Sequence, residues 1–192
     1  MFSTGTKIGA SLAGTADNCE CVPRERIAQE LSSKYLLNDE TAFIFLKSAK
    51  EDHIITDRGY IAVRGQTAGG LKRIVYRADF HAYHLSNVMF ETAGVGLTDQ
   101  DCELKFSIAG QQVSIDIKKS ELETGILYYR ALTAVAVAQA RQAQQLQLFT
   151  QLSARTVIQT AETAGPTLSN AIAALDALSP MSYASVLQAY IH

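Results

Sequence analysis

Several residue types that build specialised sites are scarce in this 192-residue chain, which has no tryptophan, 3 cysteines and 4 histidines. The cysteines, Cys19, Cys21 and Cys102, are too few for a disulfide framework and fit a reducing compartment. Cys19 and Cys21 form a C-x-C pair, but no second pair follows to complete the four ligands of a structural zinc site. We therefore expect no metal and no other cofactor.

Long apolar runs are also missing. The strongest run, "ALTAVAVA" at 131–138, is too short to cross a bilayer, and residues 1–18 lack the continuous apolar stretch of a signal peptide. The formal net charge of −2 gives no overall field that would attract nucleic acid or an anionic membrane. We expect a cytoplasmic protein without a nucleic-acid partner, and these features argue against a membrane partner.

Charge is scarce in the last third of the chain. Residues 131–192 contain only four charged side chains, Arg141, Arg155, Glu162 and Asp176. This segment is rich in Ala, Gln and Leu, which favour helix. A solvated helical tail normally carries many Glu and Lys, so we expect much of this surface to be covered. Either the preceding domain or other copies of the chain could cover it.

The first two thirds of the chain read as short strands. In "CELKFSIAG", Cys102, Leu104, Phe106 and Ile108 alternate with polar residues, which is the period-2 pattern of a half-buried strand. Gly110 and Gln111 are expected to form the turn to the next strand. Together the strands are predicted at 41–49, 53–57, 60–66, 71–80, 85–93, 102–110 and 111–119, a spacing typical of a small barrel or sandwich.

Helices are predicted on either side of these strands. Ser120 and Glu123 have the spacing of a capping box at the start of a helix that runs to about Phe149. Its core face is expected to carry Leu122, Ile126, Tyr129, Thr133, Ala136 and Ala140. Further helices are predicted at 23–36, 151–163 and 167–178, with a short last one that reaches Tyr190.

Three stretches carry a family resemblance: "HIITDRGYIAV", "GQTAGGLKR" and "FETAGVGLTDQDCELKFSIAG". They resemble the bacterial pleckstrin-homology-like family, and the resemblance covers roughly residues 38–130. The most specific part is "ETAG" at 91–94, followed by Asp99, Asp101, Glu103 and Leu104. The chain departs from the family pattern where residues 67–68 separate Gln66 from Gly69, and where Gly59 displaces the turn arginine to Arg58.

The resemblance implies a mixed α+β fold, mainly β. We expect a seven-stranded, pleckstrin-homology-like split barrel that is capped by a C-terminal helix and followed by an all-helical extension. The predicted division is an N-terminal segment with a short helix at 1–37, the barrel with its capping helix at 38–149, and the helical extension at 150–192.

The acidic stretch around 91–103 has a structural and a functional interpretation. Alternating carboxylates at Asp99, Asp101 and Glu103 could hold a calcium ion, but the full calcium-binding loop is absent. We favour turn-capping aspartates, with Glu91 and Glu103 satisfied by Lys or Arg across the strands.

Two weak sets of site residues come from the sequence. The first is basic and would bind an anionic lipid headgroup, as the resemblance to eukaryotic pleckstrin-homology domains suggests: Lys47, Lys50, Lys72, Arg73 and Arg77. The second is a small-residue stripe that would form an oligomer interface: Ala134, Ala138 and Gln142.

Catalysis has little support in the sequence. His81 and His84 in "HAYH" are three residues apart and would face opposite ways on a strand, and no G-x-S-x-G nucleophile motif is present. We therefore expect a noncatalytic interaction or scaffolding module that self-assembles or binds another protein. The alternative is a membrane-surface module that binds anionic headgroups.

Overall fold

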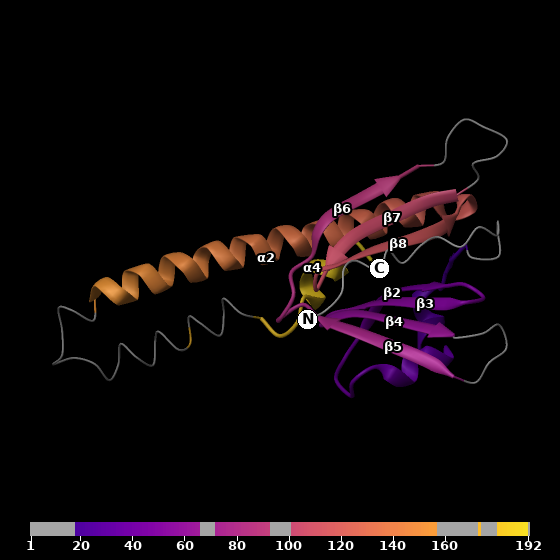
Figure 1. Ribbon diagram of the computed structural model, residues 1–192, viewed down its shortest axis with the longest axis horizontal. Helices are drawn as coiled ribbons and strands as arrows, with labels where there is room; N and C mark the ends of the chain where they lie inside the picture. The colour runs from indigo at the N-terminus through magenta and orange to yellow at the C-terminus, as the bar shows by residue number, and fades with distance from the viewer. Residues whose placement is uncertain (1–17, 66–71, 93–100, 157–172, 174–179, 192) are drawn as a thin grey trace, which may run out of the picture.

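The computed structural model describes residues 18–65, 72–92, 101–156, 173 and 180–191 of the chain. Its strands form two antiparallel sheets, which face one another in Figure 1. The five-stranded sheet has the order β1-β2-β3-β4-β5, with β1 at Glu20–Cys21, β2 at Ala42–Lys47, β3 at Glu51–Thr56, β4 at Gly59–Gly65 and β5 at Arg73–Asp79. The three-stranded sheet has the order β6-β7-β8, with β6 at Ser86–Glu91, β7 at Asp101–Ile108 and β8 at Gln111–Lys118.

In the part of the chain that the structure describes, backbone pairing joins the two sheets on one side only. Cys19 forms a parallel bridge to Ile117, in which its N–H donates to the Asp116 carbonyl at 2.8 Å and its carbonyl accepts from the Lys118 N–H at 3.1 Å. On the other side, no pairing joins β5 to β6 within the described residues. The expected split barrel is therefore confirmed, with an open side rather than full closure.

All seven predicted strands are present, and β1 is an addition. Its two residues are too few to show a period-2 pattern in the sequence. The turn between β7 and β8 lies one residue earlier than predicted, at Ala109 and Gly110, whose φ angles are 51° and 73°. Positive φ at both central residues suits the right-handed twist of a two-residue hairpin.

The central strands of the five-stranded sheet, β2 to β4, are buried on both faces, whereas β5 is largely exposed. The inner face of the sheet contributes Phe43, Ile44 and Tyr60 to the main core between the sheets. Its outer face carries a second cluster, which includes Phe45 and Ile54 and is covered by the N-terminal segment. Burial on both faces explains why the "AFIFL" of β2 is continuously apolar instead of alternating.

The N-terminal helix predicted at 23–36 is two shorter pieces. An α-helical turn, α1, spans Arg24–Ile27, and a 3₁₀ helix spans Leu31–Tyr35. Ile27 is buried against the outer cluster, whereas Leu31 is 81% exposed. The N-terminal segment covers the sheet with only a few apolar side chains, and two short helical pieces are enough to place them.

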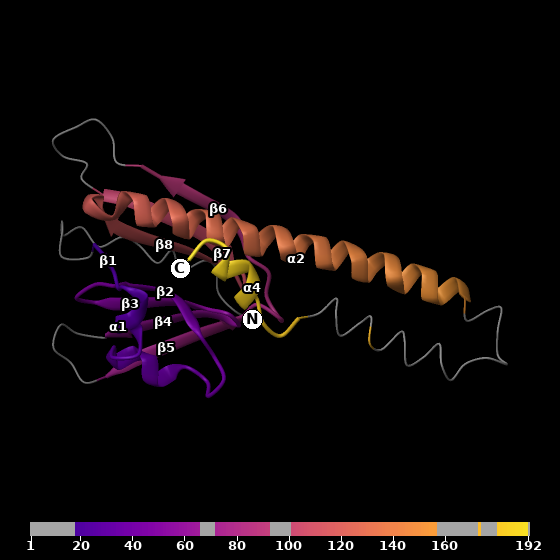
Figure 2. The same ribbon diagram turned by 180° about the vertical axis from the view of Figure 1, so that it is seen from behind.

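One long helix, α2, spans Leu122–Thr156 and runs past the end of the sheets (Figures 1 and 2). It begins after a 3₁₀ turn at Lys119–Glu121, so Ser120 lies inside that turn instead of capping α2. The predicted break near residue 150 is wrong, because the helix continues to Thr156. The rest of the helix predicted at 151–163, and nearly all of the one at 167–178, lie outside the described residues.

The core face of α2 was predicted one residue out of phase. The buried residues are Tyr128, Ala131, Leu132, Val135 and Gln139, whereas Ala140 is exposed. Gln139 is buried because its amide donates to the Phe80 carbonyl at 2.9 Å and its oxygen accepts from the Leu85 N–H at 2.8 Å. The spacing of apolar residues therefore predicted the wrong face of α2, because the true core face of this Ala-rich helix includes a polar residue.

The C-terminal end of the chain packs against its own barrel. A short helix, α4, spans Ala184–Gln188, close to where the predicted last helix lies. Tyr183, Leu187 and Ile191 belong to the same core cluster as the strands and α2. The predicted division at residue 150 stays a prediction, but at least residues 183–191 share the core of the barrel.

Candidate functional site

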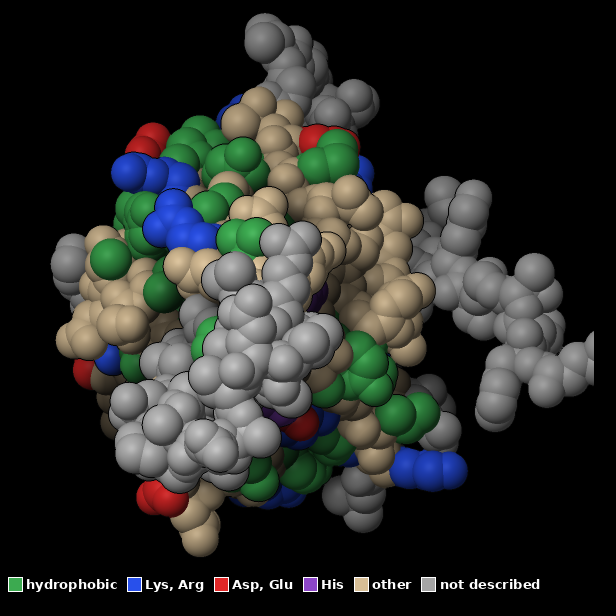
Figure 3. All heavy atoms as spheres, turned by 90° about the vertical axis from the view of Figure 1, so that its left-hand side faces the viewer, with side chains coloured by type: hydrophobic (Ala, Val, Ile, Leu, Met, Phe, Trp, Pro, Cys, Tyr) green, Lys and Arg blue, Asp and Glu red, His purple; other side chains and the backbone are tan. Residues whose placement is uncertain are grey.

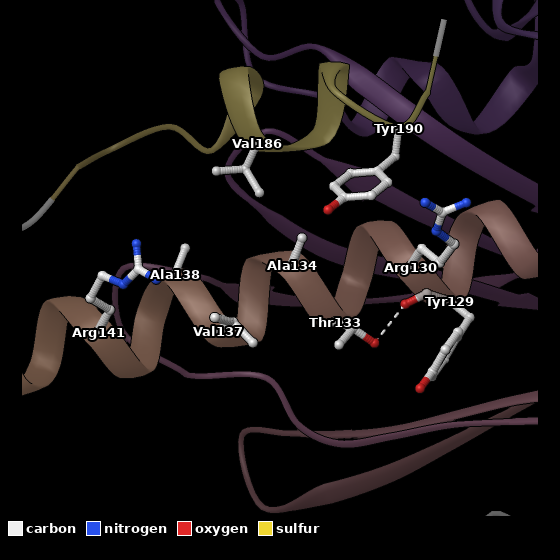
Figure 4. A pocket seen from close by; sticks show the side chains of 9 residues that line it. All are labelled: Tyr129, Arg130, Thr133, Ala134, Val137, Ala138, Arg141, Val186 and Tyr190. Carbon is white, nitrogen blue, oxygen red and sulfur yellow. Dashed lines mark hydrogen bonds between the residues drawn. The ribbon is translucent and has the colours of Figure 1, made fainter.

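A groove runs along α2 beside α4. It has a volume of about 410 Å³, and Figure 4 shows the side chains that line it: Tyr129, Arg130, Thr133, Ala134, Val137, Ala138, Arg141, Val186 and Tyr190. Ala134 and Ala138 point toward α4, and Val137, which is 53% exposed, lies on the open side. The groove is therefore mostly apolar, with arginines toward its two ends.

The polar side chains of the groove are partly engaged within the chain. The Thr133 hydroxyl donates to the Tyr129 carbonyl at 2.8 Å, and the Arg130 guanidinium lies 5.6 Å from the centre of the Tyr190 ring. Arg141 forms no ion pair within the described part of the chain. A groove lined in this way is better suited to bind an apolar surface that carries a few charges than to bind a small polar substrate.

The structure separates the three residues of the predicted interface. Ala134 and Ala138 line the groove. Gln142 lies further along α2, where its side-chain oxygen accepts a hydrogen bond from the Tyr183 hydroxyl at 2.7 Å. Sequence reasoning missed Arg130, Val137 and Arg141, although their spacing of seven and four residues was a readable signal.

The five basic candidates are dispersed. Lys47 and Arg73 line a second cavity of about 430 Å³, together with Lys34 of the 3₁₀ helix, which sequence reasoning missed. Lys50 and Lys72 do not line this cavity. Arg77 lies elsewhere on β5, where its guanidinium donates to both oxygens of Glu40, at 2.8 and 3.0 Å.

Carboxylates cancel most of the charge around the second cavity. Glu30 forms an ion pair with Lys47 at 2.5 Å, and Glu51 pairs with Arg64 at 2.8 Å. The third carboxylate, Asp52, accepts a hydrogen bond from the Ser32 hydroxyl, and burial raises its pKa despite that bond. On the face seen in Figure 3, the described lysine and arginine side chains are scattered among apolar and other polar atoms and form no large basic patch.

The described carboxylates of the acidic stretch at 91–103 form ion pairs and hydrogen bonds with neighbouring side chains. Glu91 and Glu103 lie opposite each other on β6 and β7, and Lys105 forms ion pairs with both, at 2.9 and 2.7 Å. The Glu91–Lys105 pair is the expected cross-strand contact, whereas Glu103 and Lys105 lie two residues apart on the same strand, β7. Asp101 accepts a hydrogen bond from the Asn18 amide. Asp99 lies outside the described residues, among which no cluster of potential metal ligands occurs.

One buried histidine has polar neighbours but no access to a substrate. His53 Nδ1 is hydrogen bonded to the Tyr60 hydroxyl at 2.8 Å, and its Nε2 lies 3.1 Å from a Glu51 oxygen. Burial raises the pKa of Tyr60, whose side chain is 1% exposed. His81 and His84 lie on an exposed turn after β5. The arrangement supports packing rather than proton transfer to a ligand.

The two cysteines of the C-x-C pair are unreactive in this setting. Burial raises the pKa of both Cys19 and Cys21 to about 12, so each is a neutral thiol at pH 7. Both cysteines belong to the main core or pack against it. All three cysteines of the chain are free.

None of the described helices combines the length and the apolar character needed to cross a bilayer.

The comparisons with known proteins agree with this architecture. A crystal structure of a PH domain containing bacterial protein from Exiguobacterium sibiricum superimposes with a TM-score of 0.77, at 24% identity, over 92% of this chain and 100% of that one. The protein YvbH of Bacillus subtilis, described as uncharacterised, is 29% identical over 132 residues, which are 68% of this chain and 64% of the length of YvbH. The family profile described as "Bacterial PH domain" matches residues 12–136, well over half of the chain. The chain therefore belongs to the bacterial PH domain family.

Proposed function

We propose that this chain is a noncatalytic protein-interaction module that assembles with copies of itself through the groove of α2. The observation that carries the proposal is the exposed face of α2 in that groove. Leu127 and Val137 on this face are 40% and 53% exposed, whereas the opposite face of the same stretch of helix is buried from Tyr128 to Gln139. Apolar side chains along a rigid helix gain free energy when a second surface covers them.

Two further features support a binding role instead of a catalytic one. Among the described residues, His53 is buried in the sheet, whereas His81 and His84 lie on an exposed turn. The low charge of the C-terminal third is explained only in part by α4, because Leu148 on α2 is still 58% exposed. We also propose a cytoplasmic location, because free thiols are usual in a reducing compartment.

Light scattering coupled to size exclusion tests self-assembly. We expect the full chain to elute as a discrete oligomer at micromolar concentration. Val137→Lys should weaken the association at least about tenfold, because it places a hydrated charge in the apolar groove. Leu31→Lys is the matched control, since Leu31 is exposed far from α2 and should leave the oligomer unchanged. A monomeric wild-type chain at high concentration would overturn the proposal.

A second candidate function is binding of an anionic headgroup. The observation in its favour is the cavity that gathers Lys34, Lys47 and Arg73 from three elements. Lys34 and Arg73 form no ion pair within the described residues, although the charge of Arg73 acts on the nearby Asp52 and lowers its pKa against the effect of burial. The three acidic side chains around the same cavity make this the weaker candidate.

A further inference from the structure

We propose that the second cavity, between the N-terminal 3₁₀ helix and the outer face of the five-stranded sheet, binds a free α-amino acid with an apolar side chain. The carboxylate of the ligand would contact Lys34 and Arg73, and its ammonium group would contact Asp52. This site lies away from α2, so the inference does not depend on the proposed self-assembly. The ligand differs from an anionic headgroup because it carries both charges.

The strand register builds the floor of this cavity. Asp52 of β3 lies opposite Lys47 of β2 and opposite Val63 of β4. Val63 in turn lies opposite Val75 of β5, and Arg73 precedes Val75 by two residues. Paired residues, and residues two apart on one strand, point to the same face of a sheet. The carboxylate of Asp52 therefore lies on the outer face, with a basic side chain of that face on either side of it.

The 3₁₀ helix at 31–35 covers this floor. The Ser32 hydroxyl donates to Asp52 Oδ2, which ties the helix to the sheet. Lys34 extends from the same helix, with its ammonium group 5.1 Å from the centre of the Tyr35 ring. The volume of about 430 Å³ lies within the range of small-molecule sites, which is roughly 300–1,000 Å³.

Three charges of the cavity are left without an ion pair. The carboxylates of Glu30 and Glu51 each have a basic partner. Lys34, Arg73 and Asp52 form no ion pair with another described residue. Burial raises the pKa of Asp52 although the charge of Arg73 acts against this, so a cation in contact with Asp52 would stabilise its ionised form. Two cations and one anion are therefore available to a ligand.

These three charges complement a zwitterion better than an ion of one sign. A phosphomonoester would be repelled by Asp52 and by two further carboxylates, and a simple amine would be repelled by Lys34 and Arg73. An α-amino acid holds its carboxylate and its ammonium group on one carbon atom, so the floor and the cover of one small cavity can bind both. Val63 and Tyr35 in the lining provide apolar contact for its side chain.

Calorimetric titration of the full chain with L-phenylalanine and with L-leucine tests this site. We expect at least one of them to bind with a dissociation constant below about 1 mM. The N-acetyl derivative of that amino acid lacks the ammonium group, and its amide lacks the carboxylate. Each should bind at least about tenfold more weakly. These two derivatives also resemble the ends of a peptide, so they distinguish a free amino acid from a peptide terminus.

Point variants assign the two charged contacts. Lys34→Gln and Arg73→Gln should each weaken amino-acid binding about tenfold, and both residues are exposed, so folding should be unaffected. Asp52→Asn keeps an oxygen that accepts from Ser32, but it should weaken binding of the amino acid and of its amide. Lys119→Gln is the matched control, because it removes an exposed charge away from the cavity.

Three results would overturn the proposal. The first is that neither amino acid binds at about 10 mM. The second is that the N-acetyl derivative binds as tightly as the amino acid, which would mean that the cavity recognises a carboxylate alone; inorganic phosphate that binds more tightly still would favour the headgroup candidate. The third is that Arg73→Gln and Asp52→Asn both keep the wild-type affinity, which would place the binding outside this cavity.

Discussion

At the scale of single residues, Glu40 shows how a buried carboxylate can stay ionised. Its side chain is fully buried, and it accepts hydrogen bonds from the Arg77 guanidinium, the Thr56 hydroxyl and the Leu37 N–H. Burial alone would raise the pKa of Glu40, but these hydrogen bonds outweigh it, so the pKa lies below the usual 4.5. The contacts join β5 to the segment before β2 and to the end of β3.

We expect Glu40→Gln to cost about 1–3 kcal/mol of unfolding free energy at neutral pH, because Arg77 loses its charged partner. A lowered pKa in the folded state means that the stabilisation is complete above about pH 4.5. It is lost as the pH falls through the lowered pKa. Urea unfolding from pH 7 to pH 3 should therefore show the wild type and the variant converging below about pH 4.5.

Glu25→Gln is the control for that pH series. Glu25 is exposed on α1 and forms no ion pair within the described residues, so its variant should follow the wild type at every pH. A gap between Glu40→Gln and the wild type that stays constant down to pH 3 would mean that Glu40 stabilises through packing instead of charge.

At the scale of elements, α4 is a structural part of the barrel even though it comes last in the chain. The Tyr183 N–H donates to the Asp57 carbonyl at 2.7 Å, and the Ser182 hydroxyl donates to the Asp57 carboxylate at 2.7 Å. Tyr183 also packs edge-on against Phe80, with ring centres 5.8 Å apart. Cutting the chain near Ala140 would therefore remove core residues as well as the exposed half of α2. Point variants are the cleaner test of assembly.

The packing of α4 predicts a large effect of one substitution. Leu187→Ala should lower the free energy of unfolding by about 2–5 kcal/mol, because Leu187 is completely buried and a cavity would remain. Met181→Ala, six residues earlier at a site that is 66% exposed, should change it little. Chemical denaturation of both variants measures the difference, and equal stabilities would mean that α4 does not hold to the barrel in solution.

At the scale of the whole molecule, the charge distribution bears on the choice between the two proposed functions. The net charge is −2, and the carboxylates of Glu30, Glu51 and Asp52 line the same cavity as Lys47 and Arg73. These carboxylates would repel an anionic surface about as much as Lys47 and Arg73 attract it, unless the protein reorients the carboxylates.

We therefore expect no salt-sensitive sedimentation of this chain with vesicles that contain phosphatidylserine. Measurements at two salt concentrations check this, because electrostatic binding to an anionic surface weakens as salt rises. Binding that is lost in Arg73→Glu but kept in Lys119→Glu would instead support the headgroup site. Lys119 is an exposed lysine away from the cavity, so it matches the change in charge.

The sequence by itself determined the seven strands, their order along the chain and the family signature. These rest on local signals: period-2 alternation in β7 and β8, turn residues such as Gly110, and short-range motifs. The same local reasoning predicted basic partners across the strands for Glu91 and Glu103. Lys105 is such a partner for Glu91, whereas it pairs with Glu103 within their own strand.

The tertiary structure alone decided which face of α2 is buried, that Gln139 belongs to the core, and that α4 packs into the core of the barrel. It also decided that Arg77 is held by Glu40 while Lys47 and Arg73 share a cavity. Each of these depends on contacts between residues that are distant in the chain, as Gln139 and Leu85 are, and an Ala-rich helix offers several nearly equal apolar faces. The choice among those faces is made by the packing partners, whose identity no local pattern encodes.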